Sequence, residues 1–363
     1  MPIGADAAYF FTGFLILLGI IVKRSPLLYA IQLIWMILLL GGNTFALDFP
    51  INEALYEAIG NSGYDFSILG FAYQISADYA NQYGLEFTTY NLLISIFSVL
   101  LIAWQIQKHA RNYNLAFALL YLYPFVEMVI QKRFLPAMAL SLWALQYLNR
   151  DGWKNQAKFF GIFILALGFH SAVVFYIVFW LLDRFTHKGF TRNKKFIMAL
   201  IWGGLCVVSS MIPSLAGIIF PADKVELYFE TYAESSDIFK FLFWASLHLS
   251  VVFLVAHIYR KVPQTAYTNL VFRLNIYSLF IIPLYAFDPV FMRYLRAVLI
   301  FNYMFLGDFF PERLLVRKLD LKAGGGIVLL SIIFCLVWYY LGIGNMTYER
   351  MVAPIFQHNM FIS

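Results

Sequence analysis

Residues 159–182 read FFGIFILALGFHSAVVFYIVFWLL, a largely apolar run with no Asp, Glu, Lys or Arg that is interrupted by His170. A helix of about 20 apolar residues crosses the hydrocarbon core of a bilayer, which is roughly 30 Å thick. The run is therefore long enough for one membrane span. An ionisable residue inside such a run indicates a functional site.

The whole chain has the composition of a polytopic membrane protein. Of its 363 residues, 62% are hydrophobic and 13% are charged, and the mean hydropathy is +0.73. A soluble domain carries roughly 25% charged residues, so the composition excludes a single soluble globule and a disordered chain. We expect an all-α bundle of about 11–12 transmembrane or half-transmembrane helices, forming one membrane domain over residues 1–363. The apolar runs that predict these helices are 7–22, 27–42, 87–106, 115–130, 134–148, 159–182, 196–220, 239–258, 269–287, 297–310 and 326–343.

Lys and Arg are distributed unevenly among the connecting segments. They cluster in three of them: 108–114, 149–158 and 183–195. The long acidic loop 43–86 contains neither residue type. Basic loops remain in the cytoplasm, so these three segments are expected inside. The loops expected on the outer side are 43–86, 221–238 and 288–296.

The run 159–182 is flanked by basic segments at both ends. A single crossing would place the basic residues of segment 183–195 on the outer side, against the positive-inside rule. We therefore predict a re-entrant hairpin over about 159–182 that turns near Phe169, His170 and Ser171, where protein or a water-filled cavity surrounds it. The alternative is one straight helix with His170 near the middle of the membrane.

The longest outer loop has the pattern of folded structure. Pro50 is placed to open a short helix that stops at Gly60. A second helix, opening at Asp65 or Phe66, is predicted to end before Gly84. Short amphipathic helices of this kind lie on the outer face or dock over a cavity.

Basic residues on the outer side are exceptions to the topological rule and are informative for that reason. Arg133 opens a span, and Arg293 and Arg296 form an i, i+3 pair on one helix face. A guanidinium is a planar fork that can bind phosphate through two parallel hydrogen bonds. These arginines, with Lys132, are candidates to hold a lipid-linked phosphate or diphosphate. The alternative is that each side chain extends to the lipid headgroups.

Three further residues are candidates for the chemistry. The unperturbed pKa of a histidine side chain lies near neutrality, so His170 is expected to act as a general base or as a cationic hydrogen-bond donor, unless it is a neutral core histidine. Asp48 and Glu127 are carboxylates that can orient an acceptor hydroxyl or remove its proton, unless each pairs with an arginine. The sequence shows neither metal-ligand spacing nor a nucleotide-binding loop, so we expect no metal and no other cofactor.

Several segments resemble one family of membrane proteins. They are NTFALDF (43–49) with Tyr56 and SGY (62–64), QKRFLPAMA (131–139), LALGFHSAV (165–173) and FMRYLR (291–296). These segments are similar to motifs of the EpsG/Wzy-type polysaccharide polymerases: an Asp-Tyr and Gly-Tyr region, an Arg-Gln pair that opens a span, a Phe-His-x-Ser/Ala motif and a late Arg-rich motif. Phe134 stands where the family often has Gln, and Asn43 stands near a position where many members have Arg.

The resemblance implies a glycosyltransferase of the bacterial plasma membrane whose active site faces outward. Such an enzyme polymerises oligosaccharide repeat units carried on undecaprenyl diphosphate, for capsule, exopolysaccharide or O-antigen. A flippase and a chain-length regulator are the implied partners, and no nucleic acid is expected. The implied residues are Lys132, Arg133, Arg293 and Arg296 for the diphosphate, His170, Asp48 and Glu127 for catalysis, and Tyr56, Tyr64 and Tyr294 for the sugars.

Two other functions are alternatives. An O-antigen ligase uses the same donor with a different acceptor, but ligases usually carry a larger late outer loop than 221–238. A lipid-linked oligosaccharide flippase or other transporter often has repeated halves with Gly- or Pro-broken spans at matching positions. The sequence shows no such symmetry.

Overall fold

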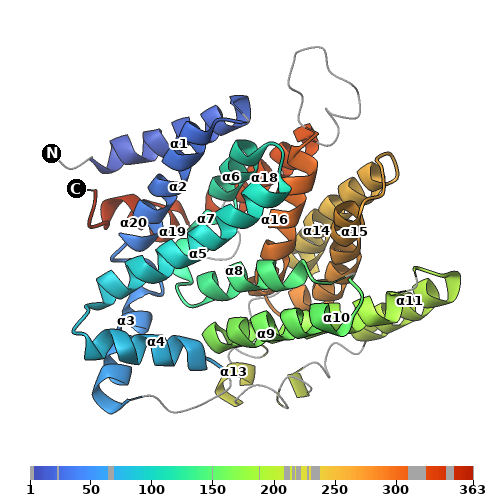
Figure 1. Cartoon of the computed structure of the whole chain (residues 1–363), viewed down its shortest axis with the longest axis horizontal. Coiled ribbons are helices and arrows are strands. Elements are labelled where there is room, and N and C mark those ends of the chain that lie inside the picture. The colour runs from blue at the N-terminus through green and yellow to red at the C-terminus, as the bar shows by residue number, and fades with distance from the viewer. Residues whose placement is uncertain are drawn as a thin grey trace. The chain divides into compact units, whose positions relative to one another are not determined.

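The computed structural model is built from helices (Figure 1). It describes residues 4–22, 24–63, 69–148, 150–187, 189–207, 213–214, 217, 222–226, 229, 238–309, 324–340 and 347–362. Within these ranges four helical stretches are long and apolar enough to cross a membrane: Phe87–His109, Ile238–Tyr259, Ala266–Ala286 and Val290–Gly307. Shorter apolar helices accompany them, and β pairing in the described residues is limited to isolated bridges. The predicted all-α polytopic membrane fold is confirmed.

The chain forms two compact units. The first comprises Met1–Val174 and Leu299–Ser363, and the second comprises Phe175–Val298. The helices of the first unit are α1 (Ala5–Ile21), α2 (Pro26–Gly41), α3 (Phe49–Ser62), α4 (Phe71–Gln82), α5 (Phe87–His109), α6 (Tyr113–Leu122), α7 (Phe125–Ile130), α8 (Phe134–Leu145), α9 (Trp153–Phe169), α18 (Gly326–Cys335), α19 (Tyr348–Met351) and α20 (Ala353–Gln357). Those of the second are α10 (Tyr176–Thr186), α11 (Arg192–Val207), α13 (Ala222–Glu226), α14 (Ile238–Tyr259) and α15 (Ala266–Ser278), and α16 (Arg293–Gly307) belongs partly to each unit.

Polar side chains hold α1, α2 and α6 together within the first unit. Gln32 is fully buried and donates from Nε2 to the carbonyl of Leu15 at 3.2 Å, and Asn114 donates from Nδ2 to Gln32 Oε1 at 3.0 Å. Gly19 allows the close approach, because a Cβ there would lie 2.5 Å from Gln32 Nε2. Unpaired polar groups are costly at membrane depth, so these bonds fix the register of the three helices.

Helix α8 is short and almost entirely buried. Its 12 residues extend about 18 Å at 1.5 Å per residue, well short of a hydrocarbon core of roughly 30 Å. It packs along α5 and α9. Because protein covers the ends of α8, its terminal backbone groups can lie within the depth of the membrane.

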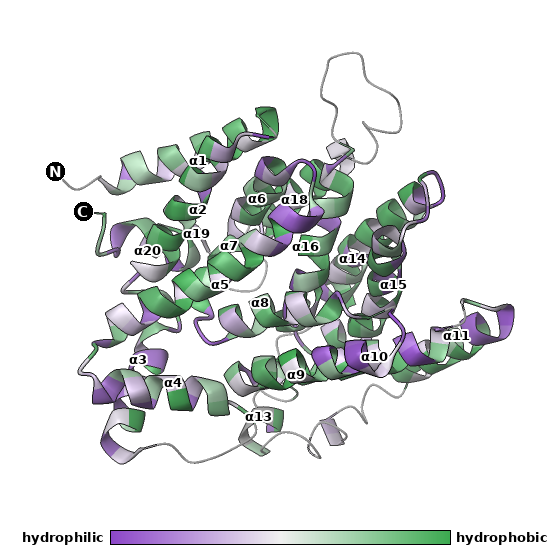
Figure 2. Cartoon of the chain, in the orientation of Figure 1, coloured by the Kyte–Doolittle hydropathy of each residue, from purple (hydrophilic) through white to green (hydrophobic). Residues whose placement is uncertain are grey.

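The two amphipathic helices predicted in loop 43–86 are present. The first, α3, begins at Phe49 and ends at Ser62; the start predicted for the second falls outside the described residues, which show α4 from Phe71. Both helices mix hydrophilic and hydrophobic residues, whereas α1 is mostly hydrophobic (Figure 2). Helix α3 docks on α5 by stacking Tyr56 on Tyr90 at 5.0 Å, and Tyr73 of α4 meets the same Tyr90 ring edge-on at 5.7 Å.

The apolar run that contains His170 is not one continuous α-helix. Helix α9 ends at Phe169, His170 has an extended backbone (φ −155°, ψ 128°), and a 3₁₀ turn follows over Ser171–Phe175. The break lies where the sequence predicted a turn. A break does not fix the direction of the next helix, so the re-entrant hairpin stays a prediction.

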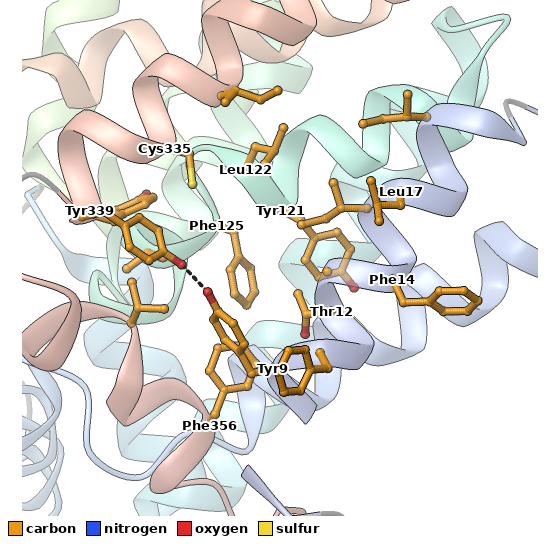
Figure 3. Close-up of a pocket in the computed structure, with 18 residues that line it drawn as sticks. Tyr9, Thr12, Phe14, Leu17, Tyr121, Leu122, Phe125, Cys335, Tyr339 and Phe356 are labelled. Carbon is orange, nitrogen blue, oxygen red and sulfur yellow. Dashed lines mark hydrogen bonds between the residues drawn. The ribbon is translucent and has the colours of Figure 1, made fainter. Parts of the chain in front are cut away.

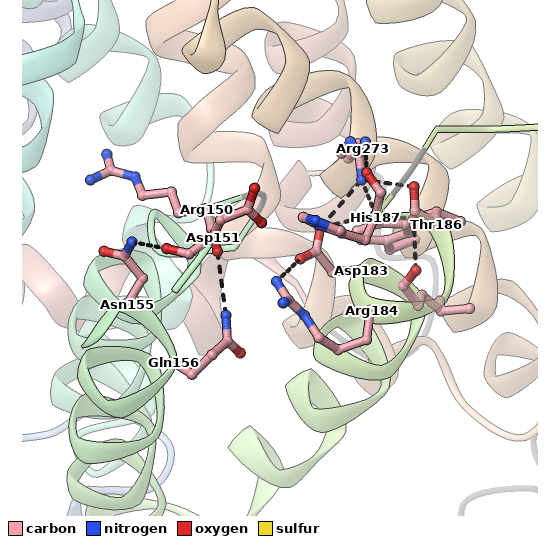
Figure 4. A network of polar contacts seen from close by, with 11 residues as sticks. Arg150, Asp151, Asn155, Gln156, Asp183, Arg184, Thr186, His187 and Arg273 are labelled. Carbon is pink, nitrogen blue, oxygen red and sulfur yellow. Dashed lines mark hydrogen bonds and ion pairs between the residues drawn. The ribbon is translucent and has the colours of Figure 1, made fainter. Parts of the chain in front are cut away.

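A buried ion-pair network lies at the C-terminal end of α10 in the second unit (Figure 4). Asp183 is fully buried and pairs with Arg184 at 3.0 Å and with Arg273 at 3.6 Å. Arg273 also donates to the carbonyls of Thr186 and His187, at 3.3 and 3.5 Å. The two arginines therefore neutralise the buried carboxylate. Arg273, on α15, also satisfies carbonyl groups at the C-terminal end of α10.

Candidate functional site

Arg133 lies in the short loop between α7 and α8, immediately before the first residue of α8. Its side chain is half-buried, and its guanidinium carbon lies 5.7 Å from the centre of the Tyr73 ring on α4. An aromatic face at this distance attracts and orients a guanidinium. Helix α4 therefore holds the cation in place while leaving part of it accessible.

His170 follows α9 and lies beside the segment that carries Arg133. Its ring meets the ring of Phe134, the residue after Arg133, edge-on at a centroid distance of 5.4 Å. Its Nδ1 accepts a hydrogen bond from the Ala172 N–H at 3.1 Å. In a neutral imidazole with Nδ1 as acceptor the proton is on Nε2, so this ring presents Nε2–H as a donor.

Helix α4 is fitted tightly against the end of α9, next to His170. A Cβ on Gly168 would lie 2.5 Å from the Phe71 ring and 2.9 Å from the Cβ of Ala72, so only glycine allows this approach. The N–H of Gly70 donates to the carbonyl of Leu167 at 3.3 Å. These contacts bring α4, the loop with Arg133 and the end of α9 together in one region of the first unit.

Tyr73 is a member of this region that sequence reasoning missed. Its side chain is 3% exposed, and its buried hydroxyl has no hydrogen-bond partner among the described residues. Burial raises the pKa of Tyr73 well above its usual value, and the neighbouring Arg133 opposes the shift in part. A buried hydroxyl without a partner is costly, so Tyr73 is a candidate to bind a ligand.

Lys132 lies deeper than Arg133 in the same loop. It is 3% exposed, and Nζ donates to the carbonyl of Leu40, in the last turn of α2, at 2.8 Å. Asn91 donates to the next carbonyl, that of Gly41, at 3.0 Å. Burial lowers the pKa of Lys132 to about 7. The described contact of Lys132 is thus that of a helix C-cap, and its binding to a diphosphate stays a prediction.

The two candidate carboxylates lie on different elements. Glu127 is on α7, is 2% exposed and accepts a hydrogen bond from the hydroxyl of Tyr339. Asp48 is half-exposed and directly precedes α3. Among the described residues, no group of three or more His, Cys, Asp or Glu side chains is placed to hold a metal ion.

The other predicted arginines lie at the start of α16. Arg293 Nε donates to the carbonyl of Val290 at 3.1 Å, and Arg296 is 1% exposed. Just before them, the carboxylate of Asp288 accepts from the Val290 N–H at 2.5 Å, and burial raises the pKa of Asp288. The i, i+3 pair is therefore buried in protein and is not extended to lipid headgroups.

The three predicted sugar-binding tyrosines have different surroundings. Tyr56 is buried, and its hydroxyl donates to the carbonyl of Leu85 at 2.6 Å. The Tyr294 ring stacks on Phe175 at 4.6 Å. Tyr64 lies outside the described residues. Binding of sugar by these residues stays a prediction.

Comparison with protein families identifies the family of this chain. The comparison finds no curated protein and no solved structure that matches the chain. The model of the EpsG family matches residues 26–351, nearly the whole chain. EpsG is a Wzy-type family of polysaccharide polymerases. The resemblance found in the motifs is confirmed, and the chain belongs to the EpsG family of membrane polysaccharide polymerases.

Proposed function

We propose that this polymerase joins oligosaccharide repeat units carried on undecaprenyl diphosphate, at the outer face of the bacterial plasma membrane. Family membership supports polymerisation in general. The observation that supports this substrate is the grouping of Arg133, Tyr73 and His170, because a cation and two potential hydrogen-bond donors meet in one region. Such a group suits an anionic leaving group.

The proposed reaction is a displacement at the anomeric carbon of the growing chain. The bond from that carbon to the diphosphate breaks, a new bond forms to a hydroxyl oxygen of the incoming unit, and undecaprenyl diphosphate departs. Negative charge grows on the departing oxygen. Arg133 stabilises this charge with a planar fork of N–H donors, and no nucleotide or metal ion takes part in the proposed step. Arg293, Arg296 and Lys132 stay further candidates to bind a diphosphate.

The proposed role of His170 follows from its tautomer. With Nδ1 engaged by Ala172, the neutral ring offers Nε2–H to a substrate oxygen and has no lone pair there to accept a proton. Donation of a hydrogen bond is thus better supported than general-base catalysis. The proton of the acceptor hydroxyl is then assigned to a carboxylate, Glu127 or Asp48.

The outward orientation and the partners are also proposals. The charge distribution of the loops favours an outward position for α3 and α4, and Tyr73 of α4 contacts Arg133. A repeat unit would reach this face through a flippase, and a chain-length regulator would act on the product.

Elongation by the purified protein in liposomes tests the proposal. Lipid-linked repeat units should lengthen into a ladder of products without added nucleotide and in the presence of a chelator. Arg133→Ala should reduce elongation at least about 100-fold, whereas Arg192→Ala, at an exposed position in α11, should not. Movement of intact units with no new glycosidic bond would indicate a transporter, and transfer only to a foreign acceptor would indicate a ligase.

A further inference from the structure

A large cavity lies within the first unit, between α1 on one side and α6, α7 and α18 on the other (Figure 3). Its volume is about 560 Å³. Its walls are mostly apolar and rich in aromatic rings, among them Phe10, Phe14, Tyr121, Phe125 and Phe356. Several lining residues of α1, including Phe10, Phe14 and Leu17, are exposed, so the cavity opens sideways along a membrane helix.

Two of the hydroxyl groups in the lining lie together at the end formed by the start of α1. The hydroxyls of Tyr9 and Tyr340 share a hydrogen bond of 2.6 Å, and Tyr348 packs against both rings. From Tyr9 the lining follows α1 to Ile20, a depth of about 17 Å at 1.5 Å per residue. That depth is about half of a hydrocarbon core of roughly 30 Å, which corresponds to one leaflet.

The polar end is expected on the outer side. Two basic residues, Lys23 and Arg24, follow α1, so the positive-inside rule places the end of α1 inside and Tyr9 outside. Tyrosine suits this position, because its ring is apolar and its hydroxyl prefers the interface. The cavity therefore has the form expected for a lipid chain whose headgroup lies at the outer surface.

The cavity is also connected to the region around Arg133. Phe125 and Val126 line it at the start of α7, and the carboxylate of Glu127 accepts from Tyr339, another lining residue. From Val126 the chain continues through α7, which ends at Ile130, to Arg133, so the two backbone positions lie at most about 17 Å apart. A tail in the cavity can therefore begin close to a diphosphate held at Arg133.

We propose that this cavity holds the isoprenoid tail of the lipid-linked donor, within the outer leaflet. The proposal rests on the proposed function, which places the diphosphate of that donor at Arg133. In an isoprenoid diphosphate the tail is joined directly to the diphosphate, so its first units must lie within a short distance of the cation. The cavity is lined by residues of α7, the helix that leads to Arg133, its open side carries exposed apolar residues of α1, and its aromatic walls match an unsaturated hydrocarbon.

Gly13 provides the test, because it lines the cavity and a Cβ built on it has no heavy atom within 4 Å. Gly13→Leu and Gly13→Phe should fill the cavity without displacing protein. The tail moves from the apolar bilayer into an apolar cavity, so its binding depends on packing and not on the hydrophobic effect. Filling the cavity should therefore weaken donor binding only moderately. For Gly13→Phe we expect the donor concentration at half-maximal elongation to rise about tenfold with the maximal rate nearly unchanged. Gly161→Phe on α9, also without a heavy atom within 4 Å, is the matched control.

A donor with its tail cut to two isoprene units separates tail binding from other effects. Wild type and Gly13→Phe should elongate this short donor equally, because little of it enters the cavity. An equal loss with short and long donors, or normal kinetics of Gly13→Phe with the long donor, would overturn the proposal while leaving the polymerase function in place.

A binding experiment keeps the test independent of activity. Undecaprenyl diphosphate with a photoreactive diazirine in its tail should label α1 near Phe14 and Leu17 in wild type and not in Gly13→Phe. Excess phospholipid should not reduce the labelling. Competition by phospholipid would show that acyl chains of the bilayer occupy the cavity. Labelling only at other positions would show that the tail does not enter it. Labelling without any elongation by wild type would reject the proposed function and not the cavity assignment.

Discussion

The guanidinium carbon of Arg133 lies 5.7 Å from the centre of the Tyr73 ring. The contact joins the start of α8 to helix α4, which precedes it in the chain. A cation over an aromatic face gains about 0.5–2 kcal/mol, depending on how far it is desolvated. Helix α4 therefore helps to orient the cation that is proposed to hold the diphosphate.

Substitution of Tyr73 separates the ring from its hydroxyl. Tyr73→Leu removes the aromatic face, so Arg133 loses its fixed orientation, and we expect the elongation rate to fall about tenfold. Tyr73→Phe keeps the ring and removes a hydroxyl without a partner among the described residues, so its unfolding temperature should not fall. A lower elongation rate in Tyr73→Phe would then report a hydrogen bond to substrate.

Two controls accompany this pair. Tyr79→Leu changes an exposed residue of the same helix and should behave as wild type. Tyr90→Phe removes a hydroxyl that bonds Ser76 at 2.8 Å, so it should lower the unfolding temperature. Wild-type elongation by Tyr73→Leu would contradict the positioning role.

Gly168 tests whether the docking of α4 matters for activity. Gly168→Val would drive a side chain into Phe71 and Ala72 and separate α4 from α9, at a cost of about 1–3 kcal/mol in unfolding free energy. We expect elongation to fall and amide hydrogens of α4 to exchange faster. Gly161→Val, on the same helix but facing open space, should change neither measurement. Unaltered exchange in α4 would show that the close approach is not required.

Part of this arrangement is predictable from sequence because it is local. Glycine and proline mark the ends of α3, and a histidine followed by serine in an apolar run marks the end of α9. The basic segments give the expected orientation without any knowledge of packing. These signals come from residues that are neighbours in the sequence, so they can be recognised without knowledge of the tertiary structure.

The rest depends on contacts between distant segments. Tyr73 carries no signal in its own neighbourhood, since its partner Arg133 is far along the chain. Lys132 has the charge expected of a phosphate ligand, yet its amine meets the carbonyl of Leu40, a contact that only the packing of α2 creates. Helices α1 and α18 both line the cavity and come from opposite ends of the sequence, so no local sequence pattern predicts it.

Lys132 should make stability depend on pH. Its pKa is about 7 in the folded protein and ordinarily 10.5, so between these values the unfolded chain holds a proton that the folded protein does not. Stability therefore rises with pH from about 7 to about 10.5. In scanning calorimetry from about pH 7 to about pH 9, the unfolding temperature of wild type should rise and that of Lys132→Met should rise less.

Lys195→Met, at an exposed position, should keep the wild-type slope. The same Lys132→Met variant also addresses the predicted diphosphate role. Elongation close to wild type at a temperature where the variant is folded would assign Lys132 to the end of α2 alone. A large loss of elongation with unchanged folding would indicate that Lys132 binds the substrate.

The role of His170 can be tested with three variants. Two of them carry an amide that imitates one ring nitrogen each, and the third removes the ring. The Nδ1 of His170 accepts from Ala172, so the proposal needs only the Nε2–H donor. A glutamine amide can place an N–H near the position of Nε2, whereas the shorter asparagine amide reaches only to Nδ1. We expect His170→Gln to keep elongation within about tenfold of wild type, and His170→Asn and His170→Ala to lose about 100-fold or more. A general base would give a different result, because neither amide accepts a proton at neutral pH, and all three variants would then be equally inactive.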